Sequence, residues 1–427
     1  MARAKKETAL TPEERLQAAL VPDWEWPYKL PENWCWTYFK SISTIQTGKK
    51  DANYGSDEGK YPFFTCAAES IRCHGYSFDC RAILLAGNGD INNISRYNGK
   101  FEAYQRTYVV KIAEPLCFDY IFYWFKYRWF DFNKGKMFGT AIPYIRLGNL
   151  QEFPTPIPSL AEQQRIVDRI ESLFAKLDEA KEKAQAVVDS FETRKAAILH
   201  KAFTGELTAK WREEHGVSID NWKTTRFDSV AAIRSNLVDP AEYQSFPHIA
   251  PDNIEKKTGV LLEYHTIAED GVTSGKHRFY SGQILYSKIR PYLSKAVVVD
   301  FDGLCSADMY PIEAYQNARC LWYYMLSDEF LLQASTAGSR SVLPKINQKE
   351  LSALTVHLPT NDREQEEIAR ILDELFDKEQ QTKEAAEIVL DQIDLMKKSI
   401  LARAFRGELG TNDPSEESAV ELLKRVL

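Results

Sequence analysis

The chain has 427 residues, 44% of them hydrophobic, and a formal net charge of −7. This length accommodates two or three domains with substantial cores. The charged amino terminus excludes a signal peptide, and the most apolar run, residues 116–130, is too short and too charged to cross a bilayer. Seven scattered cysteines are typical of thiols in a reducing compartment, so we expect a soluble, cytoplasmic protein that does not bind membranes.

The negative charge is unevenly distributed. Residues 360–427 hold 17 acidic and 10 basic residues, which accounts for the whole net charge. Residues 160–214 hold 11 acidic and 10 basic residues, so the remaining segments are close to neutral. Bulk charge therefore neither supports nor excludes a polyanionic partner, and only local basic patches can indicate one.

A charged arm occupies residues 1–29, and a first globular segment, the first head, is expected over residues 30–157. Within it YPFFTC, AILLA and RTYVVKI are typical of short strands between turns. The aromatic stretch FDYIFYWFKYRWF fits a buried helix better than a strand because of its length. Three prolines at positions 154, 156 and 158 then exclude helix up to the next element.

One uninterrupted long helix is predicted within residues 158–212. The segment beginning at Glu162 recurs from Glu364 at an offset of 202 residues without a gap, and about 19 of roughly 46 positions are identical. Apolar residues recur in alternating steps of four and three, the heptad seam of a coiled coil, and each copy is the obvious partner of the other. The seam residues are Ile166, Ile170, Leu173, Leu177, Val187, Phe191, Ile368, Leu372, Leu375, Val389, Ile393 and Ile400.

A second head is expected over residues 213–358, because its segments echo those of the first head in the same order. GQILYSK corresponds to RAILLAG, SADMYPIEA to RTYVVKI, and CLWYYMLSDEFLLQ to the aromatic helix. The second long helix follows over residues 359–410, with its seam interrupted at Glu379 and Thr382. A capped, amphipathic tail helix ends the chain within residues 411–427, and it could pack on its own chain or on a partner.

The clearest local chemistry is the segment KHRFYSGQILYSKIRPYLSKAVVV, residues 276–299. It is basic, contains no acidic residue, and alternates with tyrosines, so a strand–loop–strand edge here would suit contacts to phosphates and base edges. An equally open alternative is a solvated strand edge guarded by lysines. The candidate DNA-contacting residues, with weaker ones from loops of the first head, are Lys49, Lys50, Asn88, Arg96, Lys100, Lys134, Lys136, Lys276, Arg278, Lys288, Arg290, Tyr292, Lys295 and Arg340.

Signatures of catalysis are weak. AILLAGNGD ends in a lone Gly-x-Gly, and Gly275-Lys276 lacks the earlier glycine of a phosphate-binding loop. Cys66, Cys73 and Cys80 are seven residues apart, whereas zinc sites favour closer pairs, so buried thiols are the expected interpretation rather than a metal site. The sequence therefore indicates a binding protein, with no catalytic residues, metal or cofactor expected in this chain.

The paired helix starts IPSLAEQQRIVDRIESLF and HLPTNDREQEEIARILDELF, with the paired endings AFTGEL and AFRGEL, resemble those of type I restriction–modification specificity subunits. The resemblance covers essentially the whole chain. It implies an α+β fold in which two target recognition domains of mixed α/β structure are separated by two long antiparallel coiled-coil helices, with an internal pseudo-two-fold repeat. The interruptions at Glu379 and Thr382 are the main departures.

The resemblance also implies the function and the partners. Each head would read one half of a bipartite, asymmetric site in double-stranded DNA. The helices would set the spacing and dock two methyltransferase subunits, and restriction subunits would complete a phage-defence complex. S-adenosylmethionine and ATP would bind to those partner subunits.

Three alternatives remain at this level. A standalone DNA methyltransferase would bind S-adenosylmethionine by itself. A coiled-coil scaffold unrelated to DNA would give no gel shift even with partner subunits present. A specificity factor of a related phage-defence system would be recognised from its genome neighbourhood.

Overall fold

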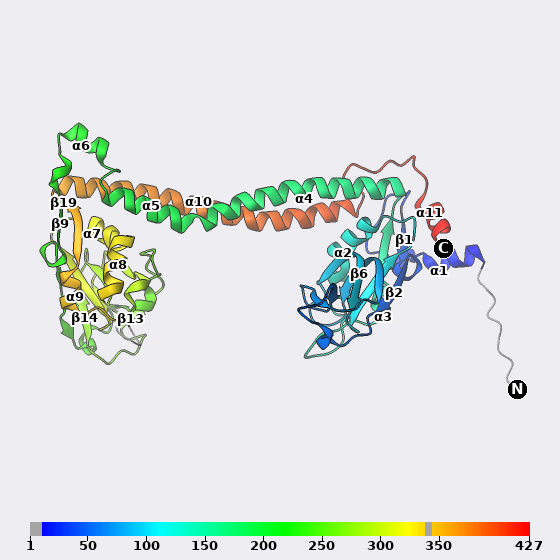
Figure 1. Ribbon diagram of the computed structural model, residues 1–427, viewed down its shortest axis with the longest axis horizontal. Coiled ribbons are helices and arrows are strands. Elements are labelled where there is room, and N and C mark those ends of the chain that lie inside the picture. The colour runs from blue at the N-terminus through cyan, green and yellow to red at the C-terminus, as the bar shows by residue number, and fades with distance from the viewer. Residues whose placement is uncertain (1–10, 338–343) are drawn as a thin grey trace. The chain divides into compact units, whose positions relative to one another are not determined.

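The computed structural model describes residues 11–337 and 344–427, and the chain divides into two compact units (Figure 1). The first unit comprises residues 1–183 and 389–427, and the second comprises residues 184–388. Each unit contains one sheet-rich head and parts of the long helices. The helices α4 (Leu160–Asp189) and α10 (Asp362–Ala404) each contribute to both units. The expected mixture of two sheet-rich domains and long helices is thereby confirmed.

The first head is built on a six-stranded sheet with the order β2-β7-β5-β6-β3-β4. Its strands are β2 (Ser43–Thr47), β3 (Tyr61–Phe64), β4 (Ile71–Cys73), β5 (Phe78–Ala86), β6 (Ile94–Ala103) and β7 (Thr107–Ile112). A separate antiparallel pair, β1 (Cys35–Tyr38) and β8 (Pro154–Ile157), opens and closes the head. The proline-rich segment is therefore not helical, as predicted, and its extended chain is followed directly by α4.

The aromatic stretch of the first head forms α2 (Phe118–Asn133), which is largely buried. Trp124 Nε1 donates to the carbonyl oxygen of Pro154 at 3.1 Å, and the Tyr120 hydroxyl donates to that of Pro156 at 2.9 Å. These bonds satisfy the polar tips of two fully buried rings. The helix is thus fixed to the closing strand β8, with the short helix α3 (Leu147–Gln151) just before that strand.

Within the first unit, α4 and the end of α10 run side by side in opposite directions. Ile166 and Ile170 are fully buried in one hydrophobic core with Leu401. Further along, Lys181 Nζ lies 3.5 Å from Asp394 Oδ1. Val389 is an exception among the expected seam residues, because 40% of it is exposed.

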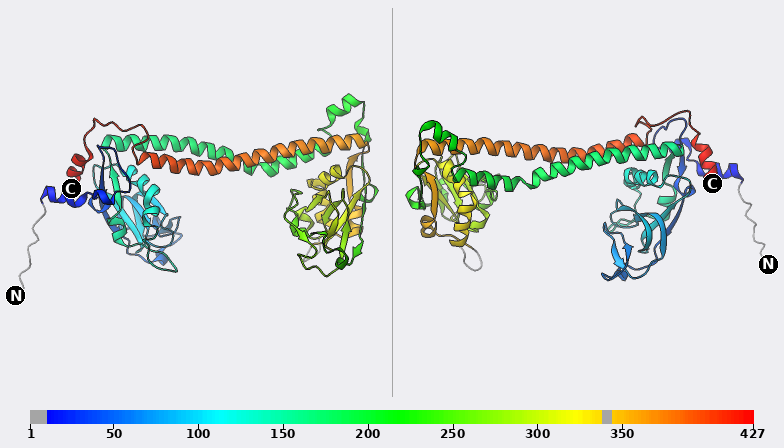
Figure 2. Two further views of the ribbon diagram at one scale, coloured as in Figure 1. Left: turned by 180° about the vertical axis from the view of Figure 1, so that it is seen from behind. Right: turned by 45° about the horizontal axis from the view of Figure 1, so that its top comes forward.

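The tail helix α11 (Ala419–Val426) packs on its own chain, which answers a question the sequence left open. Ala419, Leu422 and Leu423 are fully buried in the core that also contains α1 (Pro12–Ala19). The backbone N–H of Ala419 donates to the carbonyl oxygen of Asn33 at 3.0 Å. Figure 2 shows α11 next to α1 from two further sides.

The second head contains two sheets rather than one. The four-stranded sheet has the order β10-β18-β15-β16 and the five-stranded sheet the order β11-β14-β17-β12-β13. The strands are β10 (Ala231–Ile233), β11 (Leu237–Val238), β12 (Pro247–Ile249), β13 (His265–Thr266), β14 (Lys276–Phe279), β15 (Ile284–Ser287), β16 (Ala296–Val298), β17 (Gly303–Cys305) and β18 (Met309–Ala314).

The second head opens and closes like the first, with the antiparallel pair β9 (Trp222–Arg226) and β19 (Thr355–Pro359). Its helices are α7 (Ala318–Met325), α8 (Asp328–Ala337) and α9 (Gln348–Ala353). In both heads, a glutamine near the start of the following long helix accepts the backbone N–H that begins the aromatic helix. Gln163 accepts from Cys117 at 2.8 Å, and Gln365 accepts from Asn317 at 3.3 Å.

The prediction of one uninterrupted first long helix was wrong. The chain bends at Ser190, which separates α4 from α5 (Phe191–Phe203). The Ser190 hydroxyl donates back to the carbonyl oxygens of Ala186 and Val187, and Arg194 Nη1 also donates to the latter at 3.2 Å. Such competing bonds bend helices. The second copy carries glutamine at position 392 and forms one helix of 43 residues.

Within the second unit, α5 and the first part of α10 also run in opposite directions. Arg194 Nε donates to Glu379 at 2.7 Å, and Lys383 Nζ lies over the ring of Phe191 at 4.9 Å. Glu379, one of the two interruptions of the seam, is therefore the ion-pair partner of Arg194, which also donates to the carbonyl oxygen of Val187 at the bend. A further short helix, α6 (Ala209–His215), follows α5. No helix in the described part of the chain is both long and apolar enough to span a membrane.

Candidate nucleic-acid interface

Two of the three strands in the basic segment of the second head are not at a sheet edge, contrary to the sequence expectation; only β16 is an edge strand. β14 lies between β11 and β17 in one sheet, and β15 lies between β18 and β16 in the other. The short strand β11 pairs with the side of β14 that would otherwise be a sheet edge. Its two residues are too few to give a strand pattern in the sequence. The segment therefore contributes an inner strand to each sheet before it ends in the edge strand β16.

Three predicted lysines of this segment are engaged by the protein itself. Lys276 Nζ donates to the carbonyl oxygen and hydroxyl of Ser274 at 3.0 and 2.7 Å, and burial lowers its pKa. Lys288 Nζ donates to the carbonyl oxygen of Ala307 and Lys295 Nζ to that of Pro251. These ammonium groups hold neighbouring loops in place, so they have less capacity left for an external phosphate.

Arg290 and Tyr292, in contrast, are exposed on the turn between β15 and β16. Arg290 adopts a left-handed backbone conformation, with φ of 50°, and its backbone N–H donates to the carbonyl oxygen of Pro344 at 2.7 Å. A non-glycine residue in this conformation is strained and is held by its surroundings. Arg340, also predicted, lies outside the described residues.

Arg278 is the predicted residue with the most constrained surroundings. Its guanidinium lies over the rings of Tyr280, Tyr243 and Phe246, at 4.8, 5.4 and 6.0 Å from their centroids. No carboxylate in the described part of the chain lies within 4.0 Å of it. The positive charge therefore has no carboxylate partner among the described residues, and the three rings restrict the orientation of the guanidinium.

In the first head, lysines and tyrosines gather around β3 and β4. Lys50 Nζ lies over the ring of Tyr54 at 4.5 Å, and Lys100 Nζ over the ring of Tyr76 at 4.8 Å. Lys60, which the sequence did not single out, joins this group. Neither Lys50 nor Lys100 forms an ion pair within residues 11–337 and 344–427, and the predicted Lys49 is exposed beside them.

The remaining predicted residues of the first head lie elsewhere. Arg96 pairs with Asp119 in the first turn of α2, as does Arg81, so two guanidinium groups share one carboxylate. Asn88 forms an isolated bridge with Tyr144. Lys134 and Lys136 follow α2, and Lys136 Nζ lies 3.7 Å from the centroid of the Phe132 ring. The structure thus gathers Lys49, Lys50 and Lys100 but not the others.

The described residues include no group of three His, Cys, Asp or Glu side chains placed to hold a metal ion. Cys73 is buried, as expected, and its Sγ lies 3.0 Å from the carbonyl oxygen of Gly75. Cys66 and Cys80 are only partly buried, which differs from the expectation of three buried thiols.

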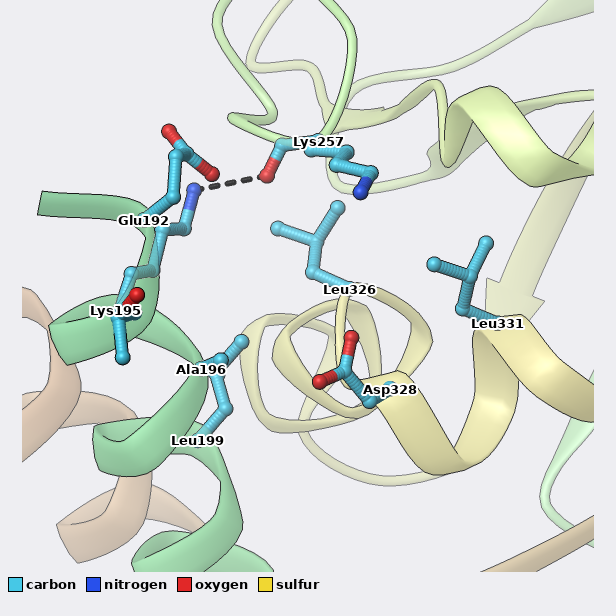
Figure 3. Close-up of a pocket in the computed structure, with 9 residues that line it drawn as sticks. Glu192, Lys195, Ala196, Leu199, Lys257, Leu326, Asp328 and Leu331 are labelled. Carbon is cyan, nitrogen blue, oxygen red and sulfur yellow. Dashed lines mark hydrogen bonds between the residues drawn. The ribbon is translucent and has the colours of Figure 1, made fainter. Parts of the chain in front are cut away.

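A buried lysine ties the second head to the long helix that precedes it (Figure 3). Lys195 of α5 donates to the carbonyl oxygen of Lys257 at 2.8 Å and to that of Thr258 at 3.2 Å. It borders a cavity of about 320 Å³ lined also by Leu326 and Leu331. Burial lowers the pKa of Lys195 to about 8. This contact orients the head loop rather than offering a free cation.

Each copy of the long-helix repeat has a buried glutamate near its start. This glutamate forms hydrogen bonds with the segment that comes directly after the other copy of the repeat. Glu364 Oε1 accepts hydrogen bonds from Arg212 at 2.7 Å, Thr208 at 2.9 Å and Trp222 at 3.0 Å. Glu162 takes the equivalent place in the first unit, accepting from Thr411 at 2.6 Å. Both glutamates are fully buried. The repeat seen in the sequence is therefore also a repeat of contacts.

Comparison with known proteins gives matches along most of the chain. Residues 31–188 and 219–389 each match the type I restriction modification DNA specificity domain. The chain is 40% identical over 428 residues to the type I restriction enzyme EcoDI specificity subunit of Escherichia coli, an alignment that covers 93% of this chain and 95% of that protein.

Solved structures show the same fold at lower sequence identity. A chain from a study of complex assembly and conformational transition of the type I R–M system superposes with a TM-score of 0.64 at 18% identity, covering 90% of this chain and all of that one. The HsdS subunit from Thermoanaerobacter tengcongensis gives a TM-score of 0.57, also at 18% identity and with the same coverage.

Proposed function

The chain belongs to the type I restriction–modification specificity subunits, and from this premise we propose that each head reads one half of a bipartite DNA target. A specificity subunit is the DNA-recognition component of its system and not the catalytic one. The observation that carries the proposal is the repeated construction of the chain. In each copy an antiparallel strand pair closes a sheet-rich head directly before a long helix.

The two half-sites should differ in sequence. The first head has a single six-stranded sheet, whereas the second has separate sheets of four and five strands. The side chains available for contact also differ. The first head has lysines that lie over tyrosine rings, whereas the second head has Arg278, whose guanidinium lies among three aromatic rings. Base contacts depend on such side chains, so unlike surfaces imply an asymmetric target.

We further propose that α4, α5 and α10 form an antiparallel coiled-coil pair related by a pseudo-two-fold repeat. In this arrangement the helices set the distance between the half-sites and dock two methyltransferase subunits. An apolar groove of about 350 Å³ supports docking in the first unit, lined by Leu173, Leu177, Met396 and Ile400. Partner subunits would supply S-adenosylmethionine, restriction and ATP-driven steps, in the cytoplasm where chromosomal DNA lies.

The first prediction concerns the methylated motif. In cells that express this chain with its methyltransferase subunits, sequencing of methylated DNA should reveal two unlike half-sites separated by a gap of fixed length. Cells that express the methyltransferase subunits alone serve as the control and should show no such motif. A contiguous or palindromic motif would contradict the proposal that each head recognises a different half-site.

The second prediction concerns the gap. Seven residues of the local heptad pattern, inserted after residue 182 in α4 and after residue 392 in α10, add about 10.5 Å to each helix. Because Lys181 faces Asp394, the two insertions lie at the same level of the first unit. We expect a longer gap between unchanged half-sites, measured as the methylated motif. An unchanged gap would show that the helices do not set the spacing.

A further inference from the structure

The register of the five-stranded sheet places Arg278 on a face that the sequence could not identify. Residues opposite each other in neighbouring strands point to the same side. His265, His248, Leu304 and Arg278 are paired in this way across β13, β12, β17 and β14. Their chain neighbours Ile249, Cys305 and Phe279 point to the other side, where they form a hydrophobic cluster with residues of the four-stranded sheet.

The face that carries Arg278 is the one turned away from the long helices of the second unit. The four-stranded sheet lies on the far side of that cluster, and its other surface packs against α7, α8 and the long helices. Figure 1 shows β13 and β14 at the end of this head opposite α5 and α10. The order of layers is therefore helices, four-stranded sheet, five-stranded sheet, and then Arg278 with Tyr243 and Phe246, which pack on this face.

The surroundings of Arg278 fix the plane of its guanidinium. Three rings surround the group, and Nη1 also lies 3.5 Å from the Tyr243 hydroxyl. Its Nε is buried and has no acceptor in the described part of the chain, so an external base can be reached only by the two Nη groups. Arginine offers several N–H donors in one plane, so a group held in this way is prepared to donate two parallel hydrogen bonds.

The other basic residues of the same segment lack this combination. The ammonium groups of Lys276, Lys288 and Lys295 donate to oxygen atoms of neighbouring loops. Arg290 is exposed, but no aromatic ring of the described residues lies against its guanidinium, so its plane is not fixed. Of the basic residues in this segment, only Arg278 both lies among aromatic rings and has no carboxylate partner in the described part of the chain.

We propose that Arg278 reads a guanine in the half-site recognised by the second head, donating two hydrogen bonds to O6 and N7 in the major groove. Bidentate contact of arginine with guanine is the commonest base-specific contact in protein–DNA complexes. Tyr243, Phe246 and Tyr280 act as positioning residues that hold the guanidinium plane. This inference rests on the proposed function, because it assumes that the second head reads DNA.

The test uses the full chain assembled with its methyltransferase subunits, in wild-type form and with Arg278→Gln or Arg278→Ala. Each base pair of the second half-site is substituted in turn in competitor duplexes. We expect the wild type to prefer guanine at one position by about 5- to 150-fold. Both variants should lose the preference at this position and keep the preferences at all other positions. Arg234→Ala is the control, because Arg234 is exposed and pairs with Glu313 at 2.8 Å.

A second pair of variants tests the positioning role. Tyr280→Leu removes one ring and should reduce the same guanine preference without changing the others, whereas Tyr280→Phe keeps the ring and should restore it. Both proteins should show unchanged recognition of the first half-site.

Three results would overturn the assignment. One is unchanged preference in Arg278→Ala at every position, and another is an equal loss of affinity for all sequences, which would indicate a phosphate contact. The third is retained guanine preference in Arg278→Gln, which keeps a long polar side chain suited to adenine and so avoids concern about folding of the alanine variant. Failure of the wild type to recognise any two-part site would instead reject the proposed function.

Discussion

Replacing Glu364 with alanine is expected to destabilise the second unit by about 3–5 kcal/mol, the cost of leaving one partner of a buried ion pair alone. The Glu364 side chain is fully buried, and only 11% of the Arg212 side chain is exposed. Without the carboxylate, the guanidinium would lose its charged partner and keep only the neutral acceptors Gly205 and Thr208, and the indole N–H of Trp222 would lose its acceptor in the interior. We expect this loss of stability to be measured as faster amide hydrogen exchange in residues 205–226 and as a lower midpoint of unfolding.

The control is Glu366→Gln, two residues further along the same helix, where the side chain is exposed. It should change the free energy of unfolding by no more than about 0.5 kcal/mol. In the first unit, Glu162→Ala should cost less than Glu364→Ala. The reason is that the Arg165 side chain is 38% exposed and keeps Glu416 as an ion-pair partner at 2.7 Å, so its charge remains paired and partly solvated. Equal losses for Glu364→Ala and Glu366→Gln would contradict the importance of the buried pair.

The pH dependence of this contribution has a defined sign. Burial tends to raise the pKa of Glu364, but hydrogen bonds from Asn221, Arg212 and Trp222 outweigh burial and place the pKa below its ordinary value of 4.5. The unfolded chain therefore binds a proton at a higher pH than the folded chain. The advantage of the wild type over Glu364→Gln should be complete above pH 4.5 and shrink as the pH falls through the folded pKa.

The duplication made the tandem architecture predictable. A repeat of about 46 residues with a heptad pattern specifies two long helices, because both the period and its length are written in the sequence. The paired heads followed from the same offset. The bend at Ser190 did not, because it depends on a serine hydroxyl competing for helix carbonyls and on Arg194 reaching Glu379 from the neighbouring helix.

The candidate site was less predictable than the fold. Composition singled out residues 276–299 as basic, but it could not show which ammonium groups find acceptors within the chain. The difference between Lys295, bound to the carbonyl oxygen of Pro251, and Arg278, held among rings from another loop, is decided by contacts distant in sequence. Strand register, which assigns Arg278 to the outer face, is likewise fixed by β17 and not by β14 itself.

The head exchange is the prediction with the largest functional effect. Replacing residues 30–157 with the corresponding head of another specificity subunit should replace one half of the methylated motif completely and leave the other half and the gap unchanged. The physical reason is the closure of the head. Cys35 pairs with Ile157, so both ends of the exchanged segment lie on one antiparallel strand pair.

The exchanged head must still fit the helices that remain. Tyr120 and Trp124 of α2 pack in the same core as Ile166 and Phe405, so a donor should carry aromatic residues at these two places. Exchange of residues 213–358 is the matched experiment, since Trp222 pairs with Pro359 in the same manner, and it should alter the opposite half-site. Both motifs are measured by sequencing methylated DNA from cells with the same methyltransferase subunits. If either exchange changed both halves of the motif, the heads would not recognise their half-sites independently. If either exchange altered the gap, the helices alone would not set the spacing.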